Sequence, residues 1–274
     1  MTEDEPGSPP EPPPPGDPVA VFESLAETYD DIGFVRLTAN RLVELAALRP
    51  GEAVLDLATG TGWAALVAAE AVGPSGRVVA TDLAEEPLAI ARAKADARGL
   101  DRIEFATGDM VAPAYPDGSF DAVLCASALF FAADPIEAIR AWRRVLRPGG
   151  RVIFTSFGAG LGGEQMGRFW AHVGRVMPPP PPMKRFDAVE CVPMLTAAGF
   201  EDVRVVEEDL DYFVDGVEAW WREVWAGLTR QPLLRLTPEE REAFRHEHLE
   251  AVADLVTADG MRMPVPAIFA IGTA

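Results

Sequence analysis

The segment Val54-Leu55-Asp56-Leu57-Ala58-Thr59-Gly60-Thr61-Gly62 runs from a short apolar stretch through an acid into a glycine-containing turn. Residues 64–71, which follow, are rich in alanine and suit a helix. Gly60 and Gly62 can take positive φ angles and let a ligand approach the backbone. In open parallel sheets, ligands bind where the carboxyl end of a strand leads into the next helix. We therefore expect a ligand site at this turn.

The same turn indicates which kind of ligand it holds. A dinucleotide site carries a third glycine three residues after the second, and Ala65 occupies that position here. Asp56 lies four residues before Gly60, where its charge would repel a pyrophosphate but suit a ligand with an ammonium group. A nicotinamide-dependent oxidoreductase is therefore disfavoured, although an ordinary tight turn also explains two glycines.

Apolar runs and helical segments alternate on both sides of this turn. Strands are expected at 53–57, 76–82, 103–107, 120–125, 151–156, 203–207 and 267–271, and helices at 19–26, 37–48, 64–71, 87–98, 135–146 and 188–198. This alternation predicts an α/β, Rossmann-like, doubly wound fold with a mostly parallel seven-stranded sheet. Further helices around 163–186 and 217–257 predict lid insertions.

Composition sets the limits of this domain and of its partners. Residues 1–18 hold prolines and acids and predict a disordered tail, which leaves 19–274 as the folded domain. The run Pro178–Pro182 predicts a stiff extended hinge or rim. A formal net charge of −19 disfavours nucleic acids and anionic membrane surfaces as partners.

Location and metal content follow from what the chain lacks. It has no apolar run of about 18 residues and no basic-then-apolar start, so we expect neither a membrane span nor a secretory signal. Cys125 and Cys191 have no metal-type spacing and predict buried apolar side chains in a reducing cytoplasm, with no metal site.

Two more strand ends carry acids. Asp82 ends the second strand, where a carboxylate commonly accepts hydrogen bonds from ribose hydroxyls, although it could also cap a helix. Gly108-Asp109-Met110 follows the third strand, where an acid can accept from an adenine amino group beside an apolar neighbour. An Asx-turn is the simpler explanation of Asp109.

With these motifs in order, the chain resembles the class I S-adenosylmethionine-dependent methyltransferases, in particular the ubiquinone/menaquinone and natural-product enzymes. VLDLATGTG, VVATDL, FATGDM, FDAVLCASALFF and RVIFTSF look like successive motifs of that family, and FESLAETYD matches its N-terminal segment. The resemblance implies S-adenosylmethionine as cofactor. It also implies cofactor contacts from Tyr29, Asp56, Ala58, Gly60, Thr61, Gly62, Asp82, Leu83, Gly108, Asp109, Met110, Ala126 and Ser127.

The acceptor side is less defined. Phe130-Phe131 stands where several relatives carry a histidine, and the chain's histidines are His172, His246 and His248, all in the expected lid. These histidines are weak candidates for a general base. Aromatic residues expected to contact a small, hydrophobic acceptor are Phe130, Phe131, Trp170, Trp221 and Trp225. The methylated atom, the base and any homo-oligomer stay open.

Two other functions stay open beside methyl transfer. A methyltransferase fold can hold S-adenosylmethionine structurally and catalyse a cyclisation or another non-methylating reaction, because fold does not dictate function. An interaction protein that kept only the fold is disfavoured, since such proteins usually lose acids like Asp56, Asp82 and Asp109.

Overall fold

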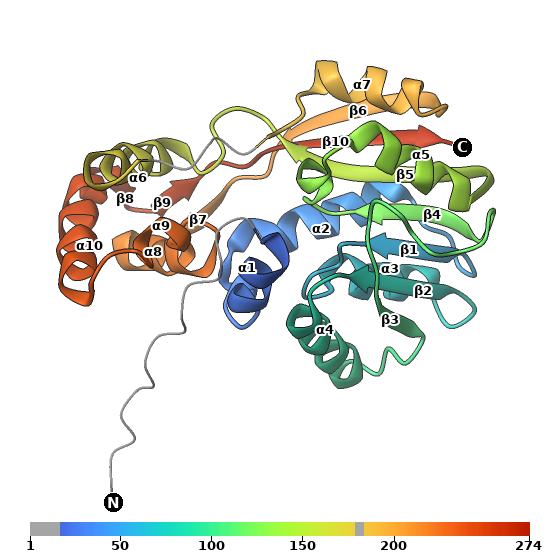
Figure 1. Ribbon diagram of the computed structural model, residues 1–274, viewed down its shortest axis with the longest axis horizontal. Coiled ribbons are helices and arrows are strands. Elements are labelled where there is room, and N and C mark those ends of the chain that lie inside the picture. The colour runs from blue at the N-terminus through green and yellow to red at the C-terminus, as the bar shows by residue number, and fades with distance from the viewer. Residues whose placement is uncertain (1–16, 179–183) are drawn as a thin grey trace, which may run out of the picture.

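Strand β1 (Ala53–Leu57) lies near the middle of a seven-stranded sheet with the order β3-β2-β1-β4-β5-β10-β6. The computed structural model describes residues 17–178 and 184–274 (Figure 1). The other strands are β2 (Arg77–Asp82), β3 (Ile103–Thr107), β4 (Phe120–Cys125), β5 (Leu146–Phe157), β6 (Glu201–Asp209) and β10 (Pro266–Thr273). Strands β1 to β5 pair in parallel, and β10 is antiparallel to both of its neighbours. The predicted α/β, mostly parallel seven-stranded fold is confirmed.

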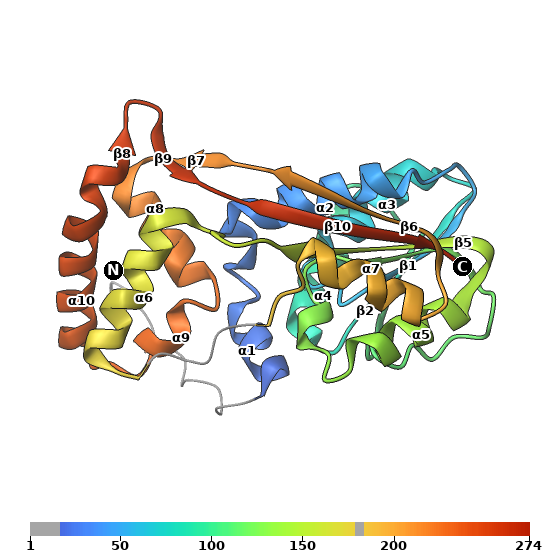
Figure 2. The same cartoon turned by 90° about the horizontal axis from the view of Figure 1, so that it is seen from above.

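The central strands are apolar because helices cover both faces of the sheet. Val54, Val78 and Val123 are completely buried, as expected for parallel strands covered on both sides. Helices α2 (Gly33–Ala46) and α3 (Trp63–Val72) pack together on one face, and α5 (Pro135–Val145) and α7 (Ala188–Ala197) on the other (Figure 2). Helix α4 (Glu85–Ala97) packs against β2 and β3.

Strand order reverses between β1 and β4, which creates the crevice in which sheets of this class bind ligands. From β1 the chain proceeds outward to β2 and β3, and then returns to form β4 on the other side of β1. The loops after β1 and β4 therefore diverge and leave room between them.

The lid combines helices with a small sheet that the sequence did not predict. Its helices are α6 (Gly163–Val176), α8 (Gly216–Ala226), α9 (Arg230–Leu233) and α10 (Pro238–Val252), and its strands are β7 (Tyr212–Val214), β8 (Val256–Thr257) and β9 (Gly260–Met263). The stretch 217–257 is mostly helical, as expected, and ends in the short strand β8. Figure 2 shows β7 and β9 continuing the lines of β6 and β10, so the lid sheet extends a ribbon of the core sheet. Leu210 N–H donates to the Val265 carbonyl at 2.9 Å and holds that ribbon together.

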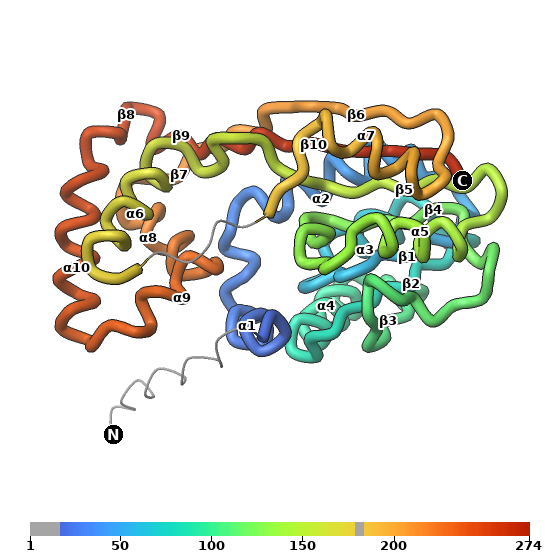
Figure 3. Tube along the Cα trace, turned by 45° about the horizontal axis from the view of Figure 1, so that its top comes forward, coloured from blue at the N-terminus to red at the C-terminus, as the bar shows by residue number. Residues whose placement is uncertain are grey.

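An N-terminal segment, which comprises α1 and the turn up to residue 31, lies between core and lid (Figure 3). Helix α1 (Pro18–Leu25) begins with Asp17 as its N-cap, so regular structure starts inside the expected tail 1–18. The rest of that tail and most of the run Pro178–Pro182 lie outside the described residues. Within residues 17–178 and 184–274, no helix combines the length and apolar character needed to cross a membrane.

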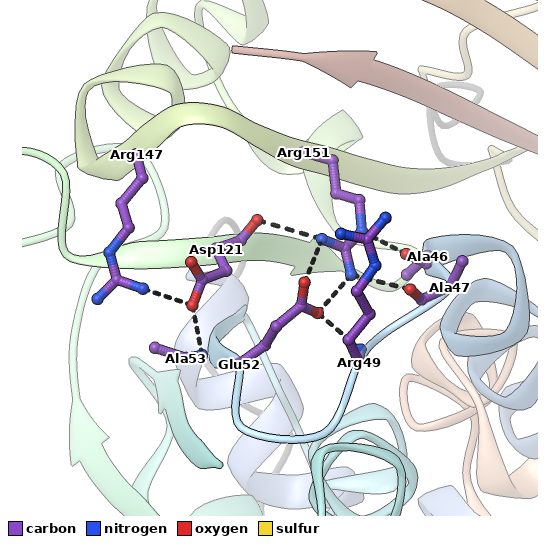
Figure 4. Close-up of polar contacts among 8 residues, drawn as sticks. All are labelled: Ala46, Ala47, Arg49, Glu52, Ala53, Asp121, Arg147 and Arg151. Carbon is purple, nitrogen blue, oxygen red and sulfur yellow. Dashed lines mark hydrogen bonds and ion pairs between the residues drawn. The ribbon is translucent and has the colours of Figure 1, made fainter.

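The edge of the sheet that carries the strand amino ends is fixed by Arg151 (Figure 4). Its guanidinium donates to the Glu52 carboxylate at 2.6 and 3.0 Å, to the Ala47 carbonyl at 3.1 Å, and to the Ala46 carbonyl. These two carbonyls end α2, so Arg151 satisfies acceptors that a helix end leaves open. Asp121 joins the same network by accepting from Ala53 N–H at 2.7 Å and from Arg147.

Candidate functional site

A cavity of about 370 Å³ lies between the carboxyl ends of β1, β2 and β4 and the N-terminal segment. That volume is within the range of small-molecule sites. Predicted residues that line it are Tyr29, Ala58, Gly60, Thr61, Asp82, Leu83, Gly108, Asp109, Met110, Ala126, Ser127 and Phe131. The three loops that the sequence singled out therefore meet at one cavity.

The charge of the lining favours a cationic ligand. Asp82 and Asp109 are its acids, and the described lining contains no histidine, lysine or arginine. The remaining lining is mostly apolar, which strengthens the field of the two carboxylates.

Asp82 links the first two loops. Its Oδ2 accepts from Gly60 N–H at 2.7 Å and its Oδ1 from Ala84 N–H at 3.0 Å. A carboxylate offers about four acceptor positions, so two remain for ligand hydroxyls. Burial raises the pKa of Asp82 above its usual value, and the backbone N–H groups oppose that shift without cancelling it. Asp82 is not the cap of α4, because the Glu23 carboxylate accepts from Glu85 and Glu86 N–H at 2.6 and 3.0 Å.

Asp56 lies behind the cavity wall. It is completely buried, and its Oδ2 accepts from the Thr59 hydroxyl at 2.5 Å. Burial raises the pKa of this carboxyl to about 7. Its Oδ1 has no partner among the described residues. The Asp56 side chain is not part of the cavity lining and shapes the turn from below, so its contact with the ligand stays a prediction.

Backbone conformation explains the glycines of this turn. Gly60 has φ +54°, and Ala58 also has a positive φ, of 52°. Gly62 has φ +87°, and a Cβ there would lie 2.7 Å from the Ala91 Cβ. Gly62 does not line the cavity. The structure gives it one clear role, the close packing of the turn on α4, and its contact with the ligand stays a prediction.

At the far end of the cavity, Asp109 forms the Asx-turn that was the simpler explanation. Its Oδ1 accepts from Val111 N–H at 3.0 Å, which uses only part of the acceptor capacity of a carboxylate. Leu83, an apolar side chain that is 46% exposed, lines the same cavity. An acid and an apolar surface are therefore available together.

Aromatic rings form the wall toward the N-terminal segment. Phe22 packs edge-on against Tyr29 at 5.9 Å and against Phe131 at 5.5 Å between ring centroids. Burial, with help from the nearby charges of Asp82 and Asp30, raises the pKa of Tyr29 to about 12, so its hydroxyl stays protonated. Phe130 packs beside Phe131 but belongs to the core and does not line the cavity.

Asp30 and Glu23, which were not among the predicted site residues, hold the N-terminal segment in place. The Asp30 carboxylate accepts from the Thr61 hydroxyl at 2.5 Å and from Trp63 Nε1 at 2.9 Å, and it pairs with Lys94. Asp30 directly follows Tyr29 in the motif FESLAETYD, and this position next to a predicted cofactor contact is the sequence feature that could have identified it.

The three histidines lie outside the cavity lining. His172 and His248 are buried in the lid core, and the His246 side chain is 73% exposed. Trp220 Nε1 donates to His248 Nε2 at 3.0 Å. Trp170 packs against the same lid core and does not line the cavity.

Trp221 and Trp225 also lie outside this cavity. They line a separate groove of about 450 Å³ between α8, α10 and the 3₁₀ turn η1 (Tyr29–Asp31).

The chain matches the family described as "Methyltransferase domain" over residues 55–154. It is 35% identical to a nocamycin O-methyltransferase of Saccharothrix syringae, with 92% of this chain and 95% of that protein covered. It is 40% identical to a ubiquinone/menaquinone biosynthesis C-methyltransferase of Pseudomonas entomophila, over 50% of this chain and 56% of that protein. A solved SAM-dependent methyltransferase from Aquifex aeolicus is 25% identical with a TM-score of 0.54, and the match covers 67% of this chain and 91% of that one.

Proposed function

The chain belongs to the class I S-adenosylmethionine-dependent methyltransferases, and from that premise we propose that it methylates a small, mainly hydrophobic, natural-product-like acceptor. The observation that carries this proposal is the cavity in which two acids and otherwise mostly apolar side chains meet at the strand ends. The relative that matches this chain over 95% of the relative's length is named as a nocamycin O-methyltransferase. This name supports a small-molecule acceptor.

The residues present fit the cofactor. Bound S-adenosylmethionine supplies a methyl group that is already activated on a sulfonium. We propose that Asp82 binds the ribose hydroxyls with the acceptor positions that Gly60 and Ala84 leave unused. Asp109 and Met110 would hold the edge of the adenine, with Leu83 against its face.

The amino-acid end of the cofactor would lie over the turn after β1. Ala58, Gly60 and Thr61 line the cavity there, and the buried Asp56 lies beneath them. The wall of Phe22, Tyr29 and Phe131 would exclude water from the sulfonium side.

The chain would promote transfer mainly by positioning the acceptor. Holding a nucleophile in line at about 3–3.5 Å can contribute roughly 7–11 kcal/mol. Because the described lining contains no histidine, lysine or arginine, we propose that no such side chain acts as a general base in this cavity.

The test is a panel of small aromatic and polyketide-like acceptors, assayed for S-adenosylhomocysteine release and for a product heavier by one methylene group. The proposal expects both signals to appear together, and to be lost in Asp82→Asn. An acceptor that is converted without release of S-adenosylhomocysteine would instead indicate the non-methylating alternative.

A further inference from the structure

The groove that holds Trp221 and Trp225, here called the tryptophan groove, is distinct from the cofactor cavity. Thr28 and Asp31 line it, whereas Tyr29, between them in sequence, lines the cofactor cavity. The η1 turn therefore borders both spaces. The groove has a volume of about 450 Å³, enough for a small organic ligand.

Two indole rings give the groove a flat apolar surface. Trp221 and Trp225 are four residues apart on α8, so they lie on the same side of that helix. Both are half-buried, whereas Trp220, on another side, is buried in the lid core. Half-buried indoles that share one groove suit stacking against a planar ligand.

Arginines give the same groove a positive character. Arg222, Arg241 and Arg245 line it, against two acids, Asp31 and Glu242. Arg245 pairs with Glu242 at 3.2 Å and with Glu218 at 2.5 Å, so its charge is compensated. An excess of arginine over acid stands out on a chain with a net charge of −19.

The other two arginines keep donors available. Arg241 lies over the Trp225 ring at 5.4 Å and donates Nε and Nη2 to the Leu233 and Leu236 carbonyls, both at 3.2 Å. Its Nη1 has no acceptor among the described residues, and neither has the exposed Arg222 guanidinium. A guanidinium matches a carboxylate in charge and geometry.

We propose that the tryptophan groove is a binding site for a planar aromatic or conjugated carboxylate. The ring system stacks on Trp221 and Trp225, and the carboxylate pairs with Arg222 and Arg241. This site is additional to the cofactor cavity, and it does not depend on the proposed function.

The test is a tryptophan-fluorescence titration with anthracene-2-carboxylate and, as the uncharged counterpart, anthracene-2-carboxamide. The carboxylate is expected to quench saturably and to bind about tenfold more tightly than the amide. Arg222→Gln is expected to remove most of that difference, and Arg235→Gln, an exposed arginine outside the groove, to leave it unchanged. Trp225→Leu is expected to weaken both probes about fivefold.

Each alternative result is decisive. Equal affinity for acid and amide, or equal effects of Arg222→Gln and Arg235→Gln, overturns the proposal. Competition between the carboxylate and S-adenosylhomocysteine also overturns it, because the probe would then occupy the cofactor cavity. Calorimetry with S-adenosylhomocysteine on each variant checks folding. If the unaltered protein does not bind S-adenosylhomocysteine, that result counts against the proposed function and leaves the groove result standing.

Discussion

The Asp30 carboxylate accepts a 2.5 Å hydrogen bond from the Thr61 hydroxyl, although these residues lie 31 positions apart in the sequence. Thr61 lies in the turn after β1, and Asp30 lies in η1, beside the aromatic wall. The same carboxylate accepts from Trp63 Nε1 at 2.9 Å and pairs with Lys94. One side chain thus holds the N-terminal segment over the cavity that we propose for the cofactor.

Loss of this carboxylate should therefore loosen the cofactor. We expect Asp30→Ala to weaken S-adenosylhomocysteine binding about tenfold, or roughly 1.4 kcal/mol, through faster dissociation. Stopped-flow tryptophan fluorescence measures the dissociation rate. Glu27→Ala, which removes an exposed acid of the same segment, is the control. An unchanged dissociation rate in Asp30→Ala would show that the segment is held by other contacts.

The lid should lose stability in mild acid because its core contains two neutral histidines. Burial, with a smaller effect from the nearby His172, lowers the pKa of His248 to about 4. Burial and the charge of Arg175 lower the pKa of His172, and Glu247, 3.3 Å away, opposes that shift. The stabilisation is complete above pH about 6.5, the usual histidine pKa, and is lost as the pH falls toward 4.

The expected loss between pH 7.5 and 5.0 is about 1–2 kcal/mol of unfolding free energy from His248. Urea denaturation of the unaltered protein and of His248→Gln at both pH values isolates this contribution. Gln keeps an acceptor for Trp220 Nε1 but takes up no proton. If the two proteins lose the same free energy in acid, His248 is not the group that titrates.

Arg151 should matter for stability and not for the cofactor. We expect Arg151→Lys to lower the unfolding free energy by about 2–3 kcal/mol, because lysine cannot reach the Ala46, Ala47 and Glu52 acceptors together. Urea denaturation measures the loss, and Arg49→Lys, at an exposed side chain of the loop that carries Glu52, is the control.

S-adenosylhomocysteine affinity should stay unchanged in Arg151→Lys below its unfolding transition. Arg151 lies at the edge of the sheet with the strand amino ends, opposite the cavity. A variant as stable as the unaltered protein would contradict the structural role assigned to this network.

Several strands of the core sheet were predicted correctly, because short runs of apolar residues between turns are enough to define them. The expected bounds of β1, β3 and β4 agree with the structure, since apolar runs flanked by turns define buried parallel strands. The start of α2 was expected at 37 and lies at Gly33, because the Glu223 side chain of the lid accepts from Gly33 N–H at 3.2 Å. No pattern around Gly33 reveals a partner 190 residues away.

The same reason explains what was missed at the site. Glu23 and Asp30 act across 31 to 64 residues of sequence, and exposed acids are common in a chain of this charge. Strands β7, β8 and β9 are short and gain their partners only when β6 and β10 bring them together. Trp221 and Trp225 were assigned to the acceptor because aromatic content alone does not show which cavity a helix faces.

The measurement that tests the central claim most directly is calorimetric titration of S-adenosylmethionine and S-adenosylhomocysteine into the unaltered protein and into Asp82→Asn. We predict a Kd of about 1 µM, near −8 kcal/mol. We also predict at least tenfold weaker binding in the variant, and no change in Asp101→Asn, which alters an exposed acid away from the cavity. The absence of binding to the unaltered protein, or equal binding by Asp82→Asn, would contradict the assignment of this cavity as the cofactor site.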